Sequence, residues 1–250
     1  MGAWQGKLGT IRDRRRRALN ICGRRSRFDI PRFRGIASVG DHIEQLNADK
    51  PTEPRPAASV ILLRRGGRHE SDGLEVLLAR RTPKASFMAD VWVFPGGALD
   101  GLTVADATED DYRAAALREL EEEVSVALGD PDRLVPFSRW ITPLEVKVRY
   151  DTSFFLAEAP PHCAPEADGQ EIVDTAWFKP ADALERHARG ELELVFPTIK
   201  NLEALARYSS VAEAIAGAHE LEIEPILPRV VTDDGPPRVL LPGDPGYPPA

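Results

Sequence analysis

The sequence predicts a mixed α/β fold, in which a mixed β-sheet is packed between α-helices. Two kinds of segment indicate this: short apolar runs rich in β-branched residues, and one long stretch with the Ala, Leu and Glu content of a helix. Strands and helices follow one another in an irregular order, which argues against a regular alternation of parallel strands and helices. With 250 residues, of which 42% are hydrophobic, the chain can bury a core of ordinary size.

The expected strands are the short apolar runs of the sequence. Residues 57–63 and 74–80 flank a polar stretch, so we expect them to form a hairpin. A third run at 91–94 precedes Pro95-Gly96-Gly97, which we expect to end the strand in a turn. Further strands are expected at 139–141, 152–157 and 175–178, and 226–231 with 238–241 predict a second hairpin.

Three segments have the composition of helices. Residues 111–126 are rich in Ala, Leu and Glu, and their acidic first turn complements the helix dipole. Residues 181–189 predict a short helix that ends at Gly190, and 197–217 contain a second long helix.

Charge divides the chain into a basic arm and an acidic body. Residues 1–35 carry one lysine and ten arginines against two aspartates, a net charge of +9, so the remainder carries −17 of the total of −8. We expect residues 1–56 to form a basic, disordered arm, 57–241 the folded domain, and 242–250 a Pro-rich tail. The acidic body argues against a broad nucleic-acid surface, which leaves the arm as the one candidate for such contacts.

Cysteine usage and hydropathy bear on where the protein works. Cys22 and Cys163 suggest neither a disulfide framework nor a Cys-based metal site, so we expect a reducing, cytoplasmic setting. The longest apolar run, near residues 57–63, is too short to span a bilayer, and no membrane partner is expected. The N-terminus lacks the apolar core of a signal peptide. The sequence is compatible with a homodimer formed through residues 199–250.

The acidic run at 118–123 (RELEEE) carries the strongest chemical signal. Residues three and four apart are neighbours on a helix, so Glu119, Glu122 and Glu123 share one face. Such close carboxylates repel one another, and a hard divalent cation such as Mg²⁺ or Mn²⁺, which takes oxygen ligands, relieves that repulsion. Arg118 can orient one carboxylate through a charge-assisted hydrogen bond. A solvated acidic helix face is the alternative interpretation.

Residues outside this run could contribute to the same site. Gly96 and Gly97 let the backbone approach a metal or a phosphate closely, which favours the metal-site interpretation. Arg80, Arg81 and Arg149 could bind substrate phosphates, with surface solvation as the alternative. Three tryptophans could stack on a base, but core packing is the commoner role for such residues: Trp92, Trp140 and Trp177.

Residues 118–126 (RELEEEVSV) resemble the Nudix box. That pattern is written Gly, five residues, Glu, seven residues, and then Arg-Glu-apolar-x-Glu-Glu-x-Gly-apolar. Ser125 stands where the family has its last Gly, and Asp110 where it has its first Glu. The loop between Gly97 and Asp110 is longer than the family pattern by seven residues. The residues FPGG at 94–97 are typical of the family.

The longer loop resembles the branch of the Nudix superfamily that includes peroxisomal coenzyme A diphosphatases. Segments outside the box are similar to that branch as well, and together they extend the resemblance over about residues 57–205: 140–143, 149–155, 168–171, Trp177 with Pro180, and 196–198.

The resemblance implies a Nudix fold, with the box as loop–helix–loop, and hydrolysis of a diphosphate linkage in a small nucleoside diphosphate-linked substrate. Coenzyme A or acyl-CoA is the leading substrate class, and ADP-ribose, dinucleotides and nucleotide sugars stay open. The implied cofactor is Mg²⁺ or Mn²⁺, held by three carboxylates and a backbone carbonyl: Glu119, Glu122, Glu123 and Gly97. Arg118 would orient Glu119, and Glu171, or else Glu166, would add a further carboxylate as metal ligand or general base.

A second functional class is compatible with the same residues. The imperfect box also fits a non-catalytic Nudix-fold module that binds nucleotides or acts as a regulator. A Nudix-fold protein that has degenerated into a non-catalytic module is expected to lose the paired glutamates of the box first, and here Glu122 and Glu123 are both present. The sequence therefore favours a hydrolase.

Overall fold

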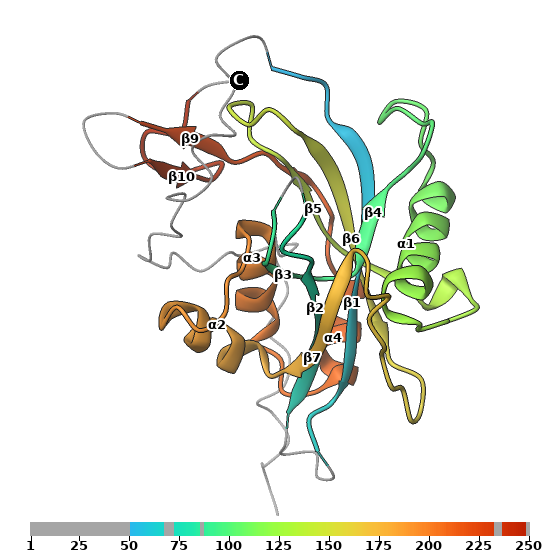
Figure 1. The fold of residues 1–250 in the computed structure, drawn as a ribbon. Coiled ribbons are helices and arrows are strands. Elements are labelled where there is room, and N and C mark those ends of the chain that lie inside the picture. Colours follow the sequence, from blue (N-terminus) through green and yellow to red (C-terminus); the bar gives the residue numbers. More distant parts are fainter. Residues whose placement is uncertain (1–50, 68–72, 86–87, 233–236, 249–250) are drawn as a thin grey trace, which may run out of the picture.

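A mixed β-sheet between two layers of helices forms the body of the protein (Figure 1). The computed structural model describes residues 51–67, 73–85, 88–232 and 237–248, so most of the expected basic arm lies outside the described residues. Helix α1 (Glu109–Val124) covers one face of the sheet. The other face is covered by α2 (Pro180–Ala188), α3 (Phe196–Leu205) and α4 (Val211–His219). The predicted mixed α/β class is confirmed.

The described part of the chain has eight strands in this sheet, and six of them follow the order β3-β2-β1-β6-β5-β8, with β4 paired to β1 and β7 to β2. Their bounds are β1 (Arg55–Arg65), β2 (Leu74–Arg81), β3 (Trp92–Val93), β4 (Gly96–Ala98), β5 (Val135–Ile141), β6 (Tyr150–Glu158), β7 (Ile172–Phe178) and β8 (Pro225–Ile226). The hairpin expected from 57–63 and 74–80 is confirmed as the antiparallel pair β1–β2. Strand β1 also pairs in parallel with β6, which makes it central.

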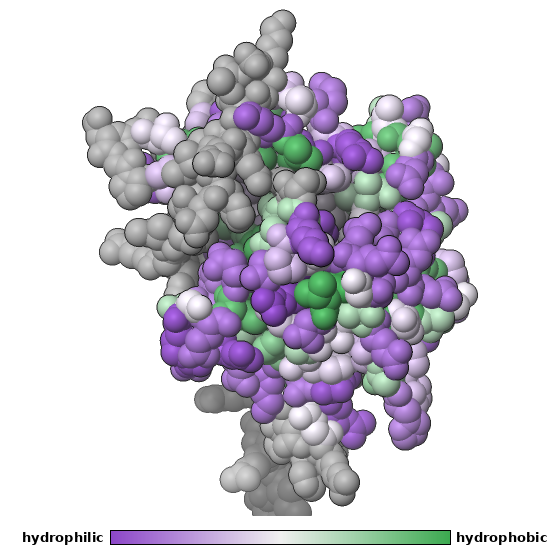
Figure 2. Space-filling model, viewed as in Figure 1, coloured by the Kyte–Doolittle hydropathy of each residue, from purple (hydrophilic) through white to green (hydrophobic). Residues whose placement is uncertain are grey.

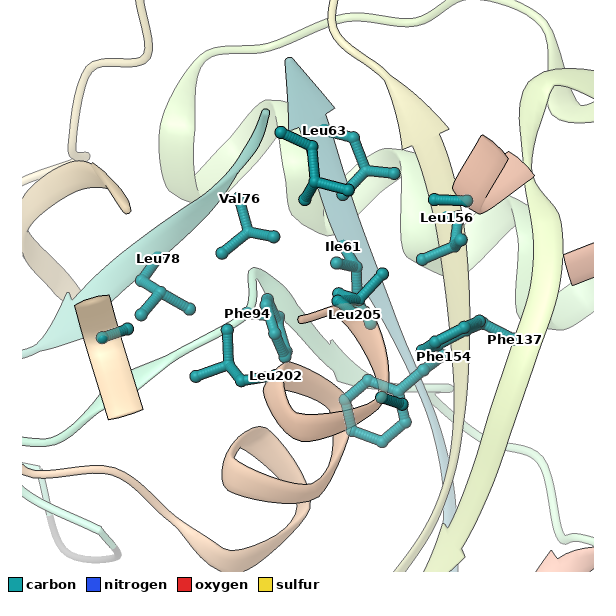
Figure 3. Packing of buried hydrophobic residues seen from close by; sticks show 14 of the residues in the cluster. Ile61, Leu63, Val76, Leu78, Phe94, Phe137, Phe154, Leu156, Leu202 and Leu205 are labelled. Carbon is teal, nitrogen blue, oxygen red and sulfur yellow. The ribbon is translucent and has the colours of Figure 1, made fainter. Parts of the chain in front are cut away.

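Strand β1 is buried on both faces, and this fixes the two halves of the core. Side chains alternate along a strand, so Ile61 and Leu63 face α3 while Val60 and Leu62 face α1. Figure 3 shows the first half, where residues of β1, β2 and β6 converge on Leu202 and Leu205 of α3. Each such fully buried side chain contributes about 1.5–3 kcal/mol. The sheet is thereby held firmly against both helical layers.

The segment 92–98 fills an opening between β1 and β2. These strands pair only where 63–65 meets 74–76, after which β3 continues along β2 and β4 continues along β1. The strand expected at 91–94 ends before Pro95, as predicted, but the turn expected at the glycines is wrong, because Gly96 and Gly97 belong to strand β4. The Pro95 carbonyl accepts hydrogen bonds from the Val60 amide at 2.9 Å and from the Ser59 hydroxyl at 2.8 Å. Pairing with β1 thus overrides the local preference of the glycines for a turn.

Two expected elements near the C-terminus are divided in the structure. The single helix expected within 197–217 is two, because Ser210 caps a new helix and its hydroxyl accepts from the Glu213 amide at 3.2 Å. The strand expected at 226–231 is also two: β8 pairs with β5, whereas β9 (Arg229–Val231) forms the expected hairpin with β10 (Arg238–Leu240). The Tyr247 hydroxyl donates to the Leu227 carbonyl at 2.7 Å, which attaches the Pro-rich tail to this region.

In the coloured part of Figure 2 hydrophilic residues predominate, and hydrophobic residues appear only in small separate areas. Among the described residues, no helix has the length and apolar character needed to cross a membrane.

Helix α1 is defined at both ends by specific backbone contacts. Thr108 and Asp111 form a reciprocal capping box at its start, two residues earlier than the composition indicated. At its end Ser125 adopts a left-handed conformation with φ of 58° and ψ of 31°, and its amide donates to the Glu121 carbonyl. This is the place where the Nudix pattern has glycine. A side chain in this conformation costs free energy that glycine does not incur.

We predict that Ser125→Gly raises the free energy of unfolding by about 1 kcal/mol, because glycine adopts the left-handed region without a steric penalty. Denaturant-induced unfolding of the two proteins measures the difference. Ser210→Gly is the matched control, since Ser210 has a negative φ and a capping hydroxyl. It should lower the free energy of unfolding, and a loss of stability in Ser125→Gly would contradict the prediction.

Candidate active site

The candidate site lies where β4 meets the last turns of α1. The Gly96 amide donates a hydrogen bond of 2.8 Å to Oε2 of Glu123, whose side chain is buried, with 5% exposure. Next to it the carboxylate of Glu119 lies directly over Gly97, so that a Cβ added to Gly97 would stand 2.3 Å from Oε1. The longer loop between Gly97 and Asp110 therefore does not separate the double glycine from the helix.

Arg118 organises the other carboxylates of the helix. Its Nη2 forms an ion pair of 2.8 Å with Oε1 of Glu119, and its Nη1 one of 2.8 Å with Oε2 of Glu122. The same guanidinium donates to the Ala98 carbonyl of β4 at 3.3 Å. Arg118 thus holds Glu119 in place, as the sequence predicted, and also ties Glu122 to the same group.

Burial changes the proton affinity of the two inner carboxylates. Burial raises the pKa of Glu123 to about 8. The hydrogen bond from Gly96 and the positive charge of Arg81 lower this pKa, whereas the negative charges of Glu119 and Glu171 raise it further. Burial also raises the pKa of Glu119, against the attraction of Arg118. A neutral carboxyl is the expected state of Glu123 at pH 7 in the absence of a cation.

Glu171 belongs to the same electrostatic group as the helix carboxylates. It is exposed, and its charge raises the pKa values of both Glu119 and Glu123. Its carbonyl accepts from the Thr82 amide at 2.8 Å, beside Arg81 at the end of β2. Glu166, the second candidate, is exposed and its amide donates to the Val124 carbonyl at the end of α1. The charge of Glu171 is thus coupled to the helix carboxylates, and its role as the additional carboxylate stays a prediction.

The arginines proposed for phosphate binding differ in their surroundings. Arg81 is half-buried and faces the acidic group, and among the described residues its buried Nε has no hydrogen-bond acceptor. Its neighbour Arg80 forms an ion pair of 2.7 Å with Asp90. Arg149 is not brought to this group: it is 6% exposed, and it donates to the carbonyls of Thr142 and Thr52.

The three tryptophans considered for base stacking are engaged in packing. Trp140 is buried and makes an edge contact with Phe196, at 5.9 Å between ring centroids. Trp92 makes a similar contact of 5.5 Å with Phe178. The guanidinium of Arg64 lies 4.3 Å from the ring centroid of Trp177. Trp140 is therefore a core residue, whereas Trp92 and Trp177 are partly buried and pack against the two halves of the core.

The carboxylates fit a divalent metal ion in their chemistry. Among the described residues, no group of three or more Asp, Glu, His or Cys side chains is arranged so that it could hold a metal ion. Glu122 is instead paired with Arg118, and Glu123 accepts a hydrogen bond from the Gly96 amide. The Glu122 side chain is 59% exposed, however, and such pairs on a helix surface contribute only about 0.3–0.5 kcal/mol. The ion pair with Arg118 therefore holds Glu122 only weakly, and Glu122 would be able to serve as a ligand if a cation were bound. Oxygen-only donors suit Mg²⁺ or Mn²⁺.

Some residues that shape the site were not identified from the sequence. Ser59 holds the Pro95 carbonyl and so fixes the approach of β4, but its position depends on strand pairing that has no local signal. Asp168 accepts three backbone amides in the loop that carries Glu171. An Asp followed by Gly is typical of such turns, so this signal was present in the sequence.

We predict that alanine substitutions at the two adjacent glycines have different effects. A Cβ at Gly96 would lie 2.3 Å from the Ala58 carbonyl, which is fixed backbone, so Gly96→Ala should lower the free energy of unfolding by roughly 1–3 kcal/mol. A Cβ at Gly97 meets only the movable end of Glu119, so Gly97→Ala should change stability by less than about 1 kcal/mol. It should instead weaken Mn²⁺ binding by about tenfold or more. Denaturant-induced unfolding measures the change in stability, and titration with Mn²⁺ measures the change in metal affinity. Equal effects of the two variants on both quantities would contradict the prediction.

Comparison with known proteins agrees with the fold and the helix. The NUDIX domain family matches residues 53–196. A crystal structure of a NUDIX hydrolase from Alicyclobacillus acidocaldarius is similar with a TM-score of 0.58 and 27% identity, over 70% of this chain and 99% of that chain. Acyl-coenzyme A diphosphatase NUDT19 of Gallus gallus is 33% identical over 125 residues, which are 46% of this chain and 32% of that protein.

A relative from Caenorhabditis elegans is 27% identical over 188 residues, or 61% of each chain. The chain therefore spans less than two thirds of the length of the curated relatives it matches. The family match at 53–196 covers more than half of the chain and contains all of β1 to β7 and α1. The chain belongs to the NUDIX domain family.

Proposed function

We propose that this chain is a metal-dependent hydrolase that cleaves the diphosphate linkage of a nucleoside diphosphate-linked substrate. The observation that carries the proposal is the buried carboxyl of Glu123, which stands between the Gly96 amide and the charges of Glu119 and Glu171. A carboxyl buried among other carboxylates is costly to keep ionised unless a cation joins it. A divalent ion bound at this place would offset the charges of Glu119, Glu123 and Glu171, which is why we propose one.

Glu119, Glu122 and Glu123 are the proposed ligands of Mg²⁺ or Mn²⁺, with the Gly97 carbonyl as a further one. When bound, such an ion neutralises charge on phosphate oxygens and lowers the pKa of water. Arg118 keeps Glu119 directed at the site through its ion pair of 2.8 Å. These assignments rest on the proximity of β4 to α1 and on membership of the family.

The remaining proposed roles concern the proton and the phosphates. Glu171 lies close enough to influence Glu119 and Glu123, and we assign it the removal of a proton from the attacking water. Arg81 is suited to a phosphate oxygen, because its buried Nε lacks an acceptor among the described residues. Arg80 would assist once its ion pair with Asp90 opens.

Coenzyme A or acyl-CoA is the substrate class that we favour. It is supported by the partial similarity to the acyl-coenzyme A diphosphatase of Gallus gallus, at 33% identity. The same similarity covers only 32% of that protein, so the substrate class needs a direct test against other diphosphates.

Incubation of the full chain with Mg²⁺ or Mn²⁺ and a panel of diphosphate substrates tests the proposal. The panel contains coenzyme A, an acyl-CoA, ADP-ribose, NADH and a dinucleoside polyphosphate, and chromatography follows the nucleotide products. We expect cleavage of a CoA substrate and a loss of about a hundredfold or more in kcat for Glu122→Gln. Glu121→Gln is the control, because Glu121 is exposed on the same helix, and it should retain activity.

Binding of a panel member without turnover would overturn the hydrolase proposal and favour the non-catalytic module. Turnover of ADP-ribose or a dinucleotide alone would retain the hydrolase and overturn the CoA assignment. Equal activity of Glu122→Gln and the unmodified protein would remove the helix carboxylates from the proposed mechanism.

A further inference from the structure

The loop between β6 and β7 is attached to the end of the helix that carries the three glutamates (Figure 1). The Glu166 amide donates to the Val124 carbonyl at 3.0 Å, and the Asp168 amide donates to the Glu123 carbonyl at 3.1 Å. The last carbonyls of a helix have no partners within the helix, so the loop satisfies groups that would otherwise need water. The loop is thereby fixed relative to Glu123.

Within this loop the carboxylate of Asp168 organises the next residues. Its Oδ1 accepts from the Ile172 amide at 2.8 Å, and its Oδ2 accepts from the amides of Glu171 at 3.1 Å and Gln170 at 3.2 Å. The Gly169 amide donates to the Ile172 carbonyl at 2.9 Å, and Gly169 has a positive φ of 75° that closes the turn. A charged acceptor that takes three amides makes a strong set of hydrogen bonds.

Glu171 is consequently held on both sides through its backbone. On one side Ile172 is fully buried, and on the other the Thr82 amide donates to the Glu171 carbonyl at 2.8 Å. The side chain of Glu171 is itself exposed, and its charge acts on Glu119 and Glu123. The position from which this side chain extends therefore depends on the turn that Asp168 maintains.

We propose that Asp168 is a positioning residue that holds Glu171 beside Glu119 and Glu123, which extends and rests on the proposed function. Asp168 acts through its three backbone hydrogen bonds and does not itself reach the substrate. Its loss leaves the amides of 170–172 without their acceptor, while the Thr82 contact and the buried Ile172 remain. Glu171 is then held less firmly than proton transfer or metal binding requires.

A double-mutant cycle separates this role from a general structural one. Asp168→Ala should lower kcat by about 10–100-fold with KM changed by less than about threefold, because a supporting contact is lost while substrate binding groups remain. Glu171→Gln should lose at least as much. The double variant should be no slower than Glu171→Gln alone, because Asp168 has no effect once Glu171 cannot act.

Two further variants serve as controls. Asp168→Asn keeps one acceptor oxygen and should retain more activity than Asp168→Ala, and it replaces that variant if Asp168→Ala does not fold. Asp130→Ala removes a carboxylate that accepts the Asp132 amide at 2.9 Å in the turn Pro131–Arg133, outside the loop that carries Glu171. It should leave kcat unchanged.

Additive losses in the double variant, or full activity of Asp168→Ala, would overturn the proposal. If the unmodified protein shows no turnover, the proposed function fails, and the same cycle is then measured as the dissociation constant for Mn²⁺. In that case Asp168→Ala and Glu171→Gln must each weaken Mn²⁺ binding, and the double variant must bind Mn²⁺ no more weakly than Glu171→Gln alone. No effect of either variant on Mn²⁺ binding would overturn the positioning role as well.

Discussion

The Gly96 amide donates to the buried carboxylate of Glu123 at 2.8 Å, and one residue further along the strand the backbone of Gly97 lies beneath Glu119. A side chain at either glycine would occupy space that β1 or α1 already fills. The close approach of β4 to β1 therefore depends on the absence of a Cβ at Gly96, and the position of the Glu119 carboxylate depends on the absence of one at Gly97. The segment 92–98 can reach this place only because β1 and β2 separate after a short pairing, so the candidate site depends on the shape of the sheet.

The helix carboxylates could be predicted from the sequence because helical geometry alone brings Glu119, Glu122 and Glu123 to one face. The family resemblance rests on the same residues, and the match to 53–196 confirms it. The longer loop after Gly97 does not disturb the site, since Thr108 starts the helix with its own capping box. Local signals of this kind survive insertions because they need no distant partner.

Features that depend on distant partners could not be predicted. The double glycine was expected to turn, yet pairing with β1 extends it. Arg149 has the charge of a phosphate ligand, but its guanidinium binds carbonyls of Thr52 and Thr142, and Thr52 is far from it in the sequence. The division of the helix expected at 197–217 is a different case, because Ser210 caps α4 through a local contact with the Glu213 amide that helix composition alone does not indicate. In each case a tertiary contact or a side-chain hydrogen bond competes with composition.

Calorimetric titration of Mn²⁺ into the metal-free protein, in buffers of different ionisation enthalpy, tests most directly whether the buried carboxyl is a metal ligand. Glu123 keeps its proton below a pKa of about 8 without a cation, and a carboxylate must be ionised to bind one. We expect release of about one proton per bound ion at pH 6.5–7, less release above pH 8, and none in Glu123→Gln. Tight binding without proton release at pH 6.5, or no binding at all, would contradict it.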